Sequence, residues 1–141
     1  MAFENPTREQ IKQILALAGN IAVVGLSDNP DRTSHMVAKA MQNRGYRIIP
    51  VNPNAEMILG EKCYPSLSDI PDPVDIVNVF RRAEQVAPIA EEAVRIKAKV
   101  FWLQLDIVNE EAAEIAKKGG LEVIMDRCIK VEDAVLNPRN K

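Results

Sequence analysis

The sequence contains a single histidine, His35, and only two cysteines, Cys63 and Cys128, among its 141 residues. One histidine cannot supply the cluster of imidazole ligands found in many zinc sites. The two cysteines lie far apart and match neither a metal-binding motif nor a disulfide framework. The scarcity of both residue types therefore argues against a metal centre and against the disulfide-rich architecture of small secreted domains.

The chain also lacks an excess of positive charge and a long apolar run. Its 18 Lys and Arg against 20 Asp and Glu give a formal net charge of −2, so no broad basic field attracts nucleic acid or an anionic membrane. No apolar run approaches the roughly 18 residues that a membrane span requires. The first residues lack the basic and apolar regions of a signal peptide. We expect a cytoplasmic protein without nucleic-acid or membrane partners, in which local donors hold any anionic ligand.

A strand–loop–helix–strand pattern runs from Ile21 to Pro53. An apolar run over 21–24 ends at the loop 25–30, a helical pattern follows over about 32–44, and a second apolar run covers 46–51. This pattern is typical of a βαβ unit. In such a unit the first loop and the start of the helix direct backbone N–H groups at one point, which suits a phosphate group.

The rest of the chain continues the alternation of strands and helices. Thr7 and Gln10 predict a capping box for a helix over about 8–18. Residues 54–72 are predicted to form a long loop, with a short edge strand or a helical turn near 64–70. Further strands are predicted at 74–80, 100–105 and 121–125, and further helices at about 84–98, 109–119 and 131–136.

Near-continuous apolar strands that alternate with helices are typical of a parallel sheet covered on both faces. We therefore predict one α/β domain over residues 1–141. Its fold is a Rossmann-like, doubly wound parallel sheet of five strands in the order 3-2-1-4-5, with three αβα layers.

Polar or conformationally special residues follow each predicted strand. Open parallel sheets bind ligands beyond the carboxyl ends of their strands, where the strand order reverses. Taken alone, each position has a simpler explanation, because residues at the end of a strand leave the core and are usually polar. The whole set, however, predicts a ligand site at this edge of the sheet. The set comprises Gly25-Leu26-Ser27, Asn52-Pro53, Phe80-Arg81, Gln104-Leu105-Asp106 and Asp126-Arg127-Cys128.

The first loop departs from the dinucleotide-binding fingerprint G-x-G-x-x-G. It reads Gly25-Leu26-Ser27-Asp28-Asn29-Pro30 and keeps only the first glycine, and Asn52 stands where an acid would hold a ribose. An NAD(P)-binding oxidoreductase or redox regulator is therefore the alternative and not the first choice.

Three arginines are candidate phosphate ligands, because a guanidinium group binds phosphate with two hydrogen bonds. Arg32 begins the helix after the first loop, and Arg81 and Arg82 end the third predicted strand. The competing interpretations are that Arg32 is a solvated surface residue and that at least one of Arg81 and Arg82 forms an ion pair with Glu84 or another neighbouring acid.

Several segments resemble the small CoA-binding proteins of bacteria and archaea. Residues 23–34 are similar to the signature V-V-G-x-S-x-x-P-x-R-x-S of that family. The resemblance covers about 7–137, nearly the whole chain. The other matching segments are Gly45-Tyr46, Val51-Asn52-Pro53, Val74-Asp75-Ile76-Val77, Phe80-Arg81, Trp102-Leu103-Gln104 and Met125-Asp126-Arg127-Cys128.

The family is similar to the N-terminal, CoA-binding half of the succinyl-CoA synthetase alpha subunit. The resemblance therefore implies that this chain binds coenzyme A. The sequence departs from the family pattern at two positions. Asp106 stands where the family usually has glycine, and Ala55 stands near the place where the synthetase has a lysine after its second strand. The implied coenzyme-binding residues are Gly25, Leu26, Ser27, Asp28, Asn29, Pro30, Arg32, Asn52, Pro53, Phe80, Arg81, Gln104 and Leu105.

The resemblance also bears on activity. The phosphorylated histidine of the synthetase belongs to a second domain, and His35 lies in the CoA-binding half, where it is no substitute. The resemblance thus implies a binder of CoA or acyl-CoA without ligase activity, which acts as a carrier, sensor or accessory subunit. Its partner would be a second copy of the chain or an acyl-CoA enzyme.

Cysteine chemistry is a further alternative. Cys128 is either a buried, inert thiol or a nucleophile that forms a mixed disulfide with CoA. No spacing indicates a catalytic triad, and Trp102 is expected in the core.

Overall fold

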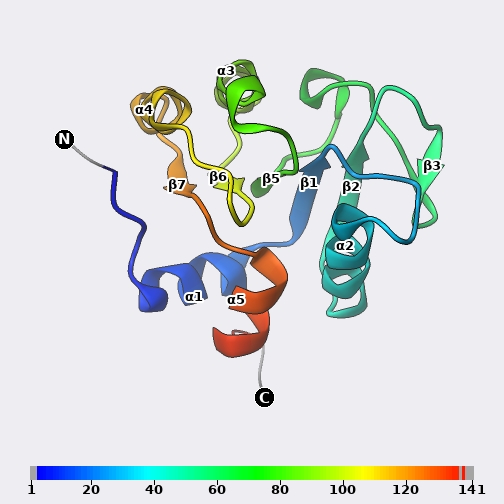
Figure 1. The fold of residues 1–141 in the computed structure, drawn as a ribbon, viewed down its shortest axis with the longest axis horizontal. Helices are drawn as coiled ribbons and strands as arrows, with labels where there is room; N and C mark the ends of the chain where they lie inside the picture. The colour runs from blue at the N-terminus through cyan, green and yellow to red at the C-terminus, as the bar shows by residue number, and fades with distance from the viewer. Residues whose placement is uncertain (1–2, 137, 139–141) are drawn as a thin grey trace.

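The computed structural model describes residues 3–136 and residue 138. The predicted domain 1–141 and the end of the resemblance at Asn137 extend beyond these residues. A five-stranded parallel sheet forms the centre of the molecule (Figure 1). Its strands are β1 (Asn20–Val24), β2 (Arg47–Val51), β5 (Ile76–Val79), β6 (Val100–Leu103) and β7 (Glu122–Ile124). The prediction of a doubly wound α/β fold is confirmed.

The predicted strand order 3-2-1-4-5 is wrong. The observed order is β2-β1-β5-β6-β7, which is 2-1-3-4-5 when the five strands are counted along the chain. The third strand pairs with the first, from Ile21 opposite Ile76 to Val24 opposite Val79. The strand order therefore reverses between β1 and β5, as in the flavodoxin-like arrangement.

Asp75 contributes a side-chain contact to this pairing. Its Oδ2 accepts hydrogen bonds from the N–H groups of Gly19 and Asn20, at 2.8 and 2.9 Å, and so holds the start of β5 beside the start of β1. The two hydrogen bonds join residues that are separated by 56 and 55 positions in the sequence. A local apolar pattern does not reveal them.

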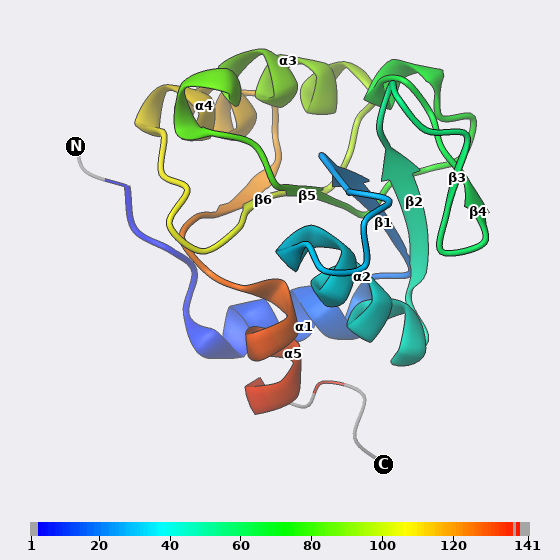
Figure 2. The same ribbon diagram turned by 45° about the vertical axis from the view of Figure 1, so that its right-hand side comes forward.

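Helices cover both faces of the sheet (Figures 1 and 2). Helices α1 (Arg8–Leu17), α2 (Thr33–Asn43) and α5 (Ile129–Leu136) lie on one face, and α3 (Ala87–Arg95) and α4 (Glu110–Lys118) lie on the other. Alternate residues of β1 enter the two cores, Ile21 and Val23 on the first face and Ala22 and Val24 on the second. All four are buried, which is why the strand reads as an uninterrupted apolar run.

Three predicted local features can be compared with the structure. The capping box of α1 is confirmed, since Thr7 and Gln10 exchange hydrogen bonds of 2.8 and 3.2 Å. The 54–72 loop contains a hairpin of β3 (Met57–Ile58) and β4 (Glu61–Lys62), a bridge between Val51 and Tyr64, and the 3-10 helix η1 (Leu67–Asp69). The helix predicted at 84–98 is shorter, because the 3-10 helix η2 (Ala83–Gln85) precedes α3.

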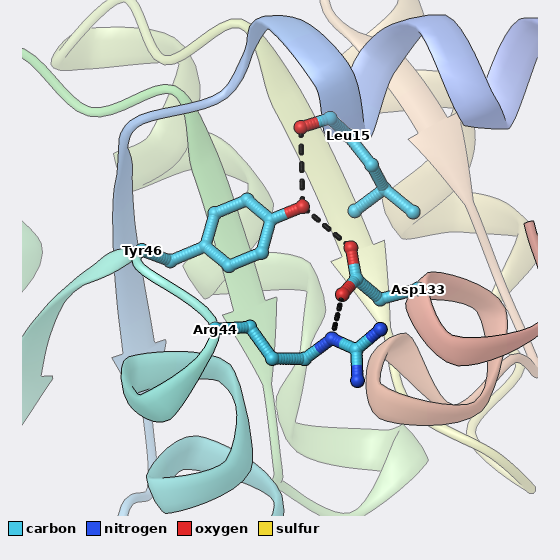
Figure 3. A network of polar contacts seen from close by, with 4 residues as sticks. All are labelled: Leu15, Arg44, Tyr46 and Asp133. Atoms are coloured by element: carbon cyan, nitrogen blue, oxygen red, sulfur yellow. Dashed lines mark hydrogen bonds and ion pairs between the residues drawn. The ribbon is translucent and has the colours of Figure 1, made fainter. Parts of the chain in front are cut away.

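A buried polar network joins α1, the end of α2 and α5 (Figure 3). Asp133 is 2% exposed and accepts hydrogen bonds from the Tyr46 hydroxyl and from Nε of Arg44. The Tyr46 hydroxyl also lies 3.2 Å from the carbonyl oxygen of Leu15. A buried carboxylate needs such partners, because an uncompensated charge in the core is costly.

We expect Asp133→Asn to lower the free energy of unfolding by about 2 kcal/mol, since it removes the charge of a buried acceptor that serves both Tyr46 and the partly exposed Arg44. Urea unfolding measures the loss. The matched control is Asp72→Asn, which breaks the exposed Arg47–Asp72 pair of 2.9 Å and should cost less than about 0.5 kcal/mol. Equal losses in the two variants would contradict the structural role of Asp133.

Asp75 makes stability depend on pH. Its partial burial acts to raise the pKa of its carboxyl group, but the N–H groups of Asn20 and Gly19 and the ammonium group of Lys99 outweigh burial and hold that pKa below its ordinary value. A carboxylate with a lowered pKa stabilises the fold at pH values above its unfolded pKa of about 3.9. This contribution is lost as the pH falls through the folded-state pKa.

Asp75→Asn should therefore lower stability by about 1 kcal/mol at pH 7 and by progressively less below about pH 4. Urea unfolding at several pH values from 7 to 2 measures the difference between wild type and variant. A difference that stays constant through the acid range would refute this role.

Candidate functional site

The reversal of strand order places the carboxyl ends of β1 and β5 next to each other. Gly25 follows β1 with a φ of +85°, and Phe80 follows β5. A Cβ atom on residue 25 would lie 2.3 Å from the carbonyl oxygen of Phe80. Glycine is therefore required here for two reasons, a left-handed backbone and the close approach of a neighbouring chain.

Two adjoining cavities open at this point and share Thr33 and Phe80. The loop pocket encloses about 510 Å³ and is lined by Gly25, Ser27, Asp31, Arg32, Thr33, Ser34 and Phe80. The main cleft encloses about 750 Å³ and is lined by Thr33, Phe80, Arg81, Arg82, Ala83, Glu84, Gln104, Leu105, Asp106, Ile107 and Cys128. Their volumes are in the usual range of ligand sites.

Internal hydrogen bonds hold the first loop in shape. The N–H of Ser27 donates to Ser34 Oγ, the N–H of Asn29 to Ser27 Oγ, and the N–H groups of Asp31 and Arg32 to Asn29, at 2.9–3.0 Å. A phosphate could reach these four amides only by displacing their present acceptors. The first turn of α2 differs, because Arg32 is its N-cap residue and no side chain caps it. The first N–H groups of α2 therefore keep their capacity to donate.

The remaining residues of the first loop and the loop after β2 lie outside both cavities. Leu26 is fully buried, and its carbonyl oxygen accepts a 2.9 Å hydrogen bond from Nδ2 of Asn52. Oδ1 of Asn52 accepts from the N–H of Asn54 at 2.7 Å. Nδ2 of Asn52 thus ties the two loops together, while its Oδ1 holds the turn of its own loop. The other predicted binding residues that line neither cavity are exposed, namely Asp28, Asn29, Pro30 and Pro53.

The arginines of the site differ in their partners. Nε of Arg82 lies 3.9 Å from Glu84, so the predicted ion pair is confirmed for this arginine. Nε of Arg81 lies 3.4 Å from the position of a Cβ on Gly25, at the mouth of the first loop. Within the described residues neither Arg81 nor Arg32 forms an ion pair. Two uncompensated cations therefore line the cavities in a protein of net negative charge.

The far end of the main cleft carries an amide. Gln104 is only 4% exposed, and its Oε1 accepts hydrogen bonds from Nδ2 of Asn78 at 3.3 Å and from the N–H of Ile129 at 2.9 Å. Nε2 of Gln104 forms no hydrogen bond to any described residue. This donor remains available to a ligand.

Asp106 also lines the main cleft, with a φ of +70°, and its N–H donates to Oδ1 of Asp126 at 2.7 Å. Glycine adopts such a left-handed conformation more readily than aspartate does. The carboxylate of Asp106 adds a negative charge to the cleft.

The two cysteines occupy different environments. Cys63 is 7% exposed, and burial, followed by the negative charge of Asp28, raises the pKa of its thiol. Cys128 is half-buried and lines the main cleft.

His35 and Trp102 have structural contacts. Nδ1 of His35 lies 2.9 Å from the carbonyl oxygen of Ser27, to which its N–H donates. Trp102 is fully buried, as expected, and its Nε1 donates to the carbonyl oxygen of Arg127 at 2.8 Å.

The structure also adds residues to the site that the sequence did not indicate. Thr33, Ser34, Ala83 and Ile107 line the cavities. Ser34 is the last residue of the signature over 23–34, and Thr33 lies at the start of the predicted helix, so these two signals could have indicated both residues. Across the described residues no cluster of His, Cys, Asp and Glu is placed to bind a metal ion, and no helix has the length and hydropathy to cross a membrane.

The arrangement is that of a Rossmann-like αβα domain, in which a helix N-terminus without a side-chain cap lies at the reversal of strand order. A family described as CoA binding domain matches residues 19–134. The chain therefore belongs to the CoA-binding domain family.

Three relatives illustrate the range of this family. The uncharacterized protein YneT of Bacillus subtilis is 58% identical over 133 residues, which cover 94% of this chain and 98% of YneT. A solved structure of a hypothetical protein from Pyrococcus horikoshii has a TM-score of 0.91 and 38% identity, and covers 97% of this chain and 99% of that one. The ADP-forming acetate–CoA ligase II of Archaeoglobus fulgidus is 32% identical over 116 residues. That match covers 74% of this chain but only 17% of the ligase.

Gly25→Ala should cost about 3 kcal/mol or more in stability, because the new Cβ clashes with the Phe80 carbonyl group and the backbone is left-handed. The control is Gly60→Ala, where φ is +77° but no atom lies within 4 Å of the new Cβ. It should cost only about 1–2 kcal/mol. Thermal or urea unfolding compares the two, and similar losses would show that the close approach to Phe80 is unimportant.

Proposed function

We propose that this protein binds coenzyme A or an acyl-CoA in the two adjoining cavities and acts as a CoA-binding module without ligase chemistry of its own. A cytoplasmic carrier, sensor or accessory subunit fits this proposal. The proposal is supported by membership of the CoA-binding domain family and by the chemistry of the residues that line the cavities.

One observation carries the proposal. Arg32 and Arg81, which form no ion pair with described residues, flank the uncapped N-terminus of α2 at the reversal of strand order. Guanidinium groups and helix N–H groups are strong donors to phosphate oxygens. The diphosphate of CoA would lie here, against Gly25 and Ser27.

The rest of the coenzyme has a route through the main cleft. Phe80 and Leu105 supply apolar surface, and Nε2 of Gln104 is a donor for an amide carbonyl of the pantetheine arm. The other predicted residues line neither cavity, so they would contact only a nucleotide part that extends beyond the loop pocket, namely Asp28, Asn29, Pro30, Asn52 and Pro53.

NAD(P) fits the site less well. A dinucleotide site of the usual kind holds the ribose hydroxyls with an acid at the end of the second strand. Asn52 has that position, and both ends of its amide are occupied by the protein backbone.

Calorimetry with CoA, dephospho-CoA and NAD tests the proposal. Arg81→Gln and Arg32→Gln should each weaken CoA binding by about tenfold, the value of one charge-assisted hydrogen bond of about 1.4 kcal/mol. Arg82→Gln is the matched control, since Arg82 already pairs with Glu84, and it should change the affinity by less than about threefold.

The proposal fails if the wild type gives no heat with CoA at millimolar concentration, or if NAD binds more tightly than CoA. An equal loss of affinity in Arg82→Gln and Arg81→Gln would contradict the assignment of the phosphate site to Arg81.

A further inference from the structure

Cys128 has a position that distinguishes it from Cys63. It lies between the end of β7 and the start of α5, it is half-buried, and it lines the main cleft. Cys63 is buried among core residues and lines neither cavity. A small molecule in the main cleft would therefore meet one thiol and not the other.

Gln104 independently indicates that a ligand passes this thiol. Its side chain is more than nine-tenths buried, it lines the same cleft, and its Nε2 has no acceptor among the described residues. Every fully buried side-chain N or O atom among the described residues has a hydrogen-bond partner, so Nε2 of Gln104 lies at the surface of the cleft, where a ligand can accept its hydrogen bond. The Oε1 of the same amide accepts from the N–H of Ile129, the residue directly after Cys128. The open donor and the thiol thus belong to one contiguous part of the cleft.

The length of the cleft matches the pantetheine arm. From β1, beside the phosphate site, to β7, beside Cys128, there are three strand spacings, or about 14 Å at about 4.8 Å each. An extended pantetheine arm has about as many chain atoms as four to five amino-acid residues, and so spans on the order of 15 Å. A CoA whose diphosphate lies at α2 therefore brings its sulfur close to Cys128.

We propose that Cys128 accepts CoA covalently, by thiol–disulfide exchange with a CoA disulfide. This inference rests on the proposed CoA binding. Cys128 first loses its proton to solvent, and its thiolate attacks one sulfur of the disulfide. The S–S bond of the CoA disulfide breaks, a new bond forms between Cys128 Sγ and the sulfur of one CoA, and the second CoA leaves as a thiolate that takes up a proton. No electrons are gained or lost overall, and a reducing thiol reverses the step.

The non-covalent contacts set the selectivity of this reaction. Arg32, Arg81 and Gln104 hold the nucleotide and the arm, which raises the effective concentration of the disulfide at Cys128. A disulfide without the nucleotide gains nothing from these contacts. Modification should therefore be specific to CoA disulfides over other small disulfides.

Intact-mass spectrometry of the reduced full-length chain after incubation with CoA disulfide tests the inference. We expect the mass to rise by one CoA per chain less two hydrogen atoms, and the adduct to be reversed by dithiothreitol and located at Cys128 by peptide mapping. Cys128→Ser should abolish the adduct, and the control Cys63→Ser should retain it. The reaction should be at least about tenfold faster than with glutathione disulfide, and reduced CoA should slow it by competition.

Calorimetry of the reduced wild type with reduced CoA separates this inference from the proposed function. If CoA binds but no adduct forms, or the adduct forms on Cys63, the covalent step is overturned and CoA binding stands. Equal rates with glutathione disulfide, or no protection by reduced CoA, would likewise overturn it, because Cys128 would then be a generally accessible thiol. If reduced CoA does not bind at all, the proposed function itself is overturned.

Discussion

The close approach of Gly25 to the carbonyl group of Phe80 is the constraint on which the site depends. It allows β1 and β5 to lie side by side up to their last residues before their continuations separate. The chain after β1 then leads to α2 on one face, while the chain after β5 leads through η2 to α3 on the other (Figure 2). The two cavities open where these paths part. A larger residue at position 25 would push the strand ends apart and change both cavities at once.

The electrostatics of the site are local. The chain has a net charge of −2, yet Arg32 and Arg81 line the cavities without a carboxylate partner among the described residues. Glu84 pairs with Arg82, and Asp106 adds a nearby negative charge. An anionic ligand would therefore be held by short contacts to particular groups, and not by a long-range field that salt screens readily.

Helix α5 connects the site to the stability of the fold. At its start the N–H of Ile129 donates to Oε1 of Gln104, beside Cys128. One turn later, Asp133 joins Tyr46 and Arg44 in the network under α1 (Figure 3). The same short helix thus orients a cleft residue and is anchored in the core. This anchoring gives the amide of Gln104 a fixed orientation, which is the condition for a donor to recognise one acceptor position.

The sequence by itself determined the elements and the class of protein. Uninterrupted apolar runs such as 21–24 indicate buried parallel strands, Thr7 and Gln10 predict a cap, and the first loop resembles that of CoA-binding proteins. Only the tertiary structure decided that β5 lies beside β1, because strands buried on both faces carry no pattern that selects a neighbour. It also decided that Arg82 is paired while Arg81 is not, and that Gln104 keeps an open donor. Such distinctions depend on contacts between distant segments, as Asp75 and Gly19 illustrate, and local periodicity contains no information about them.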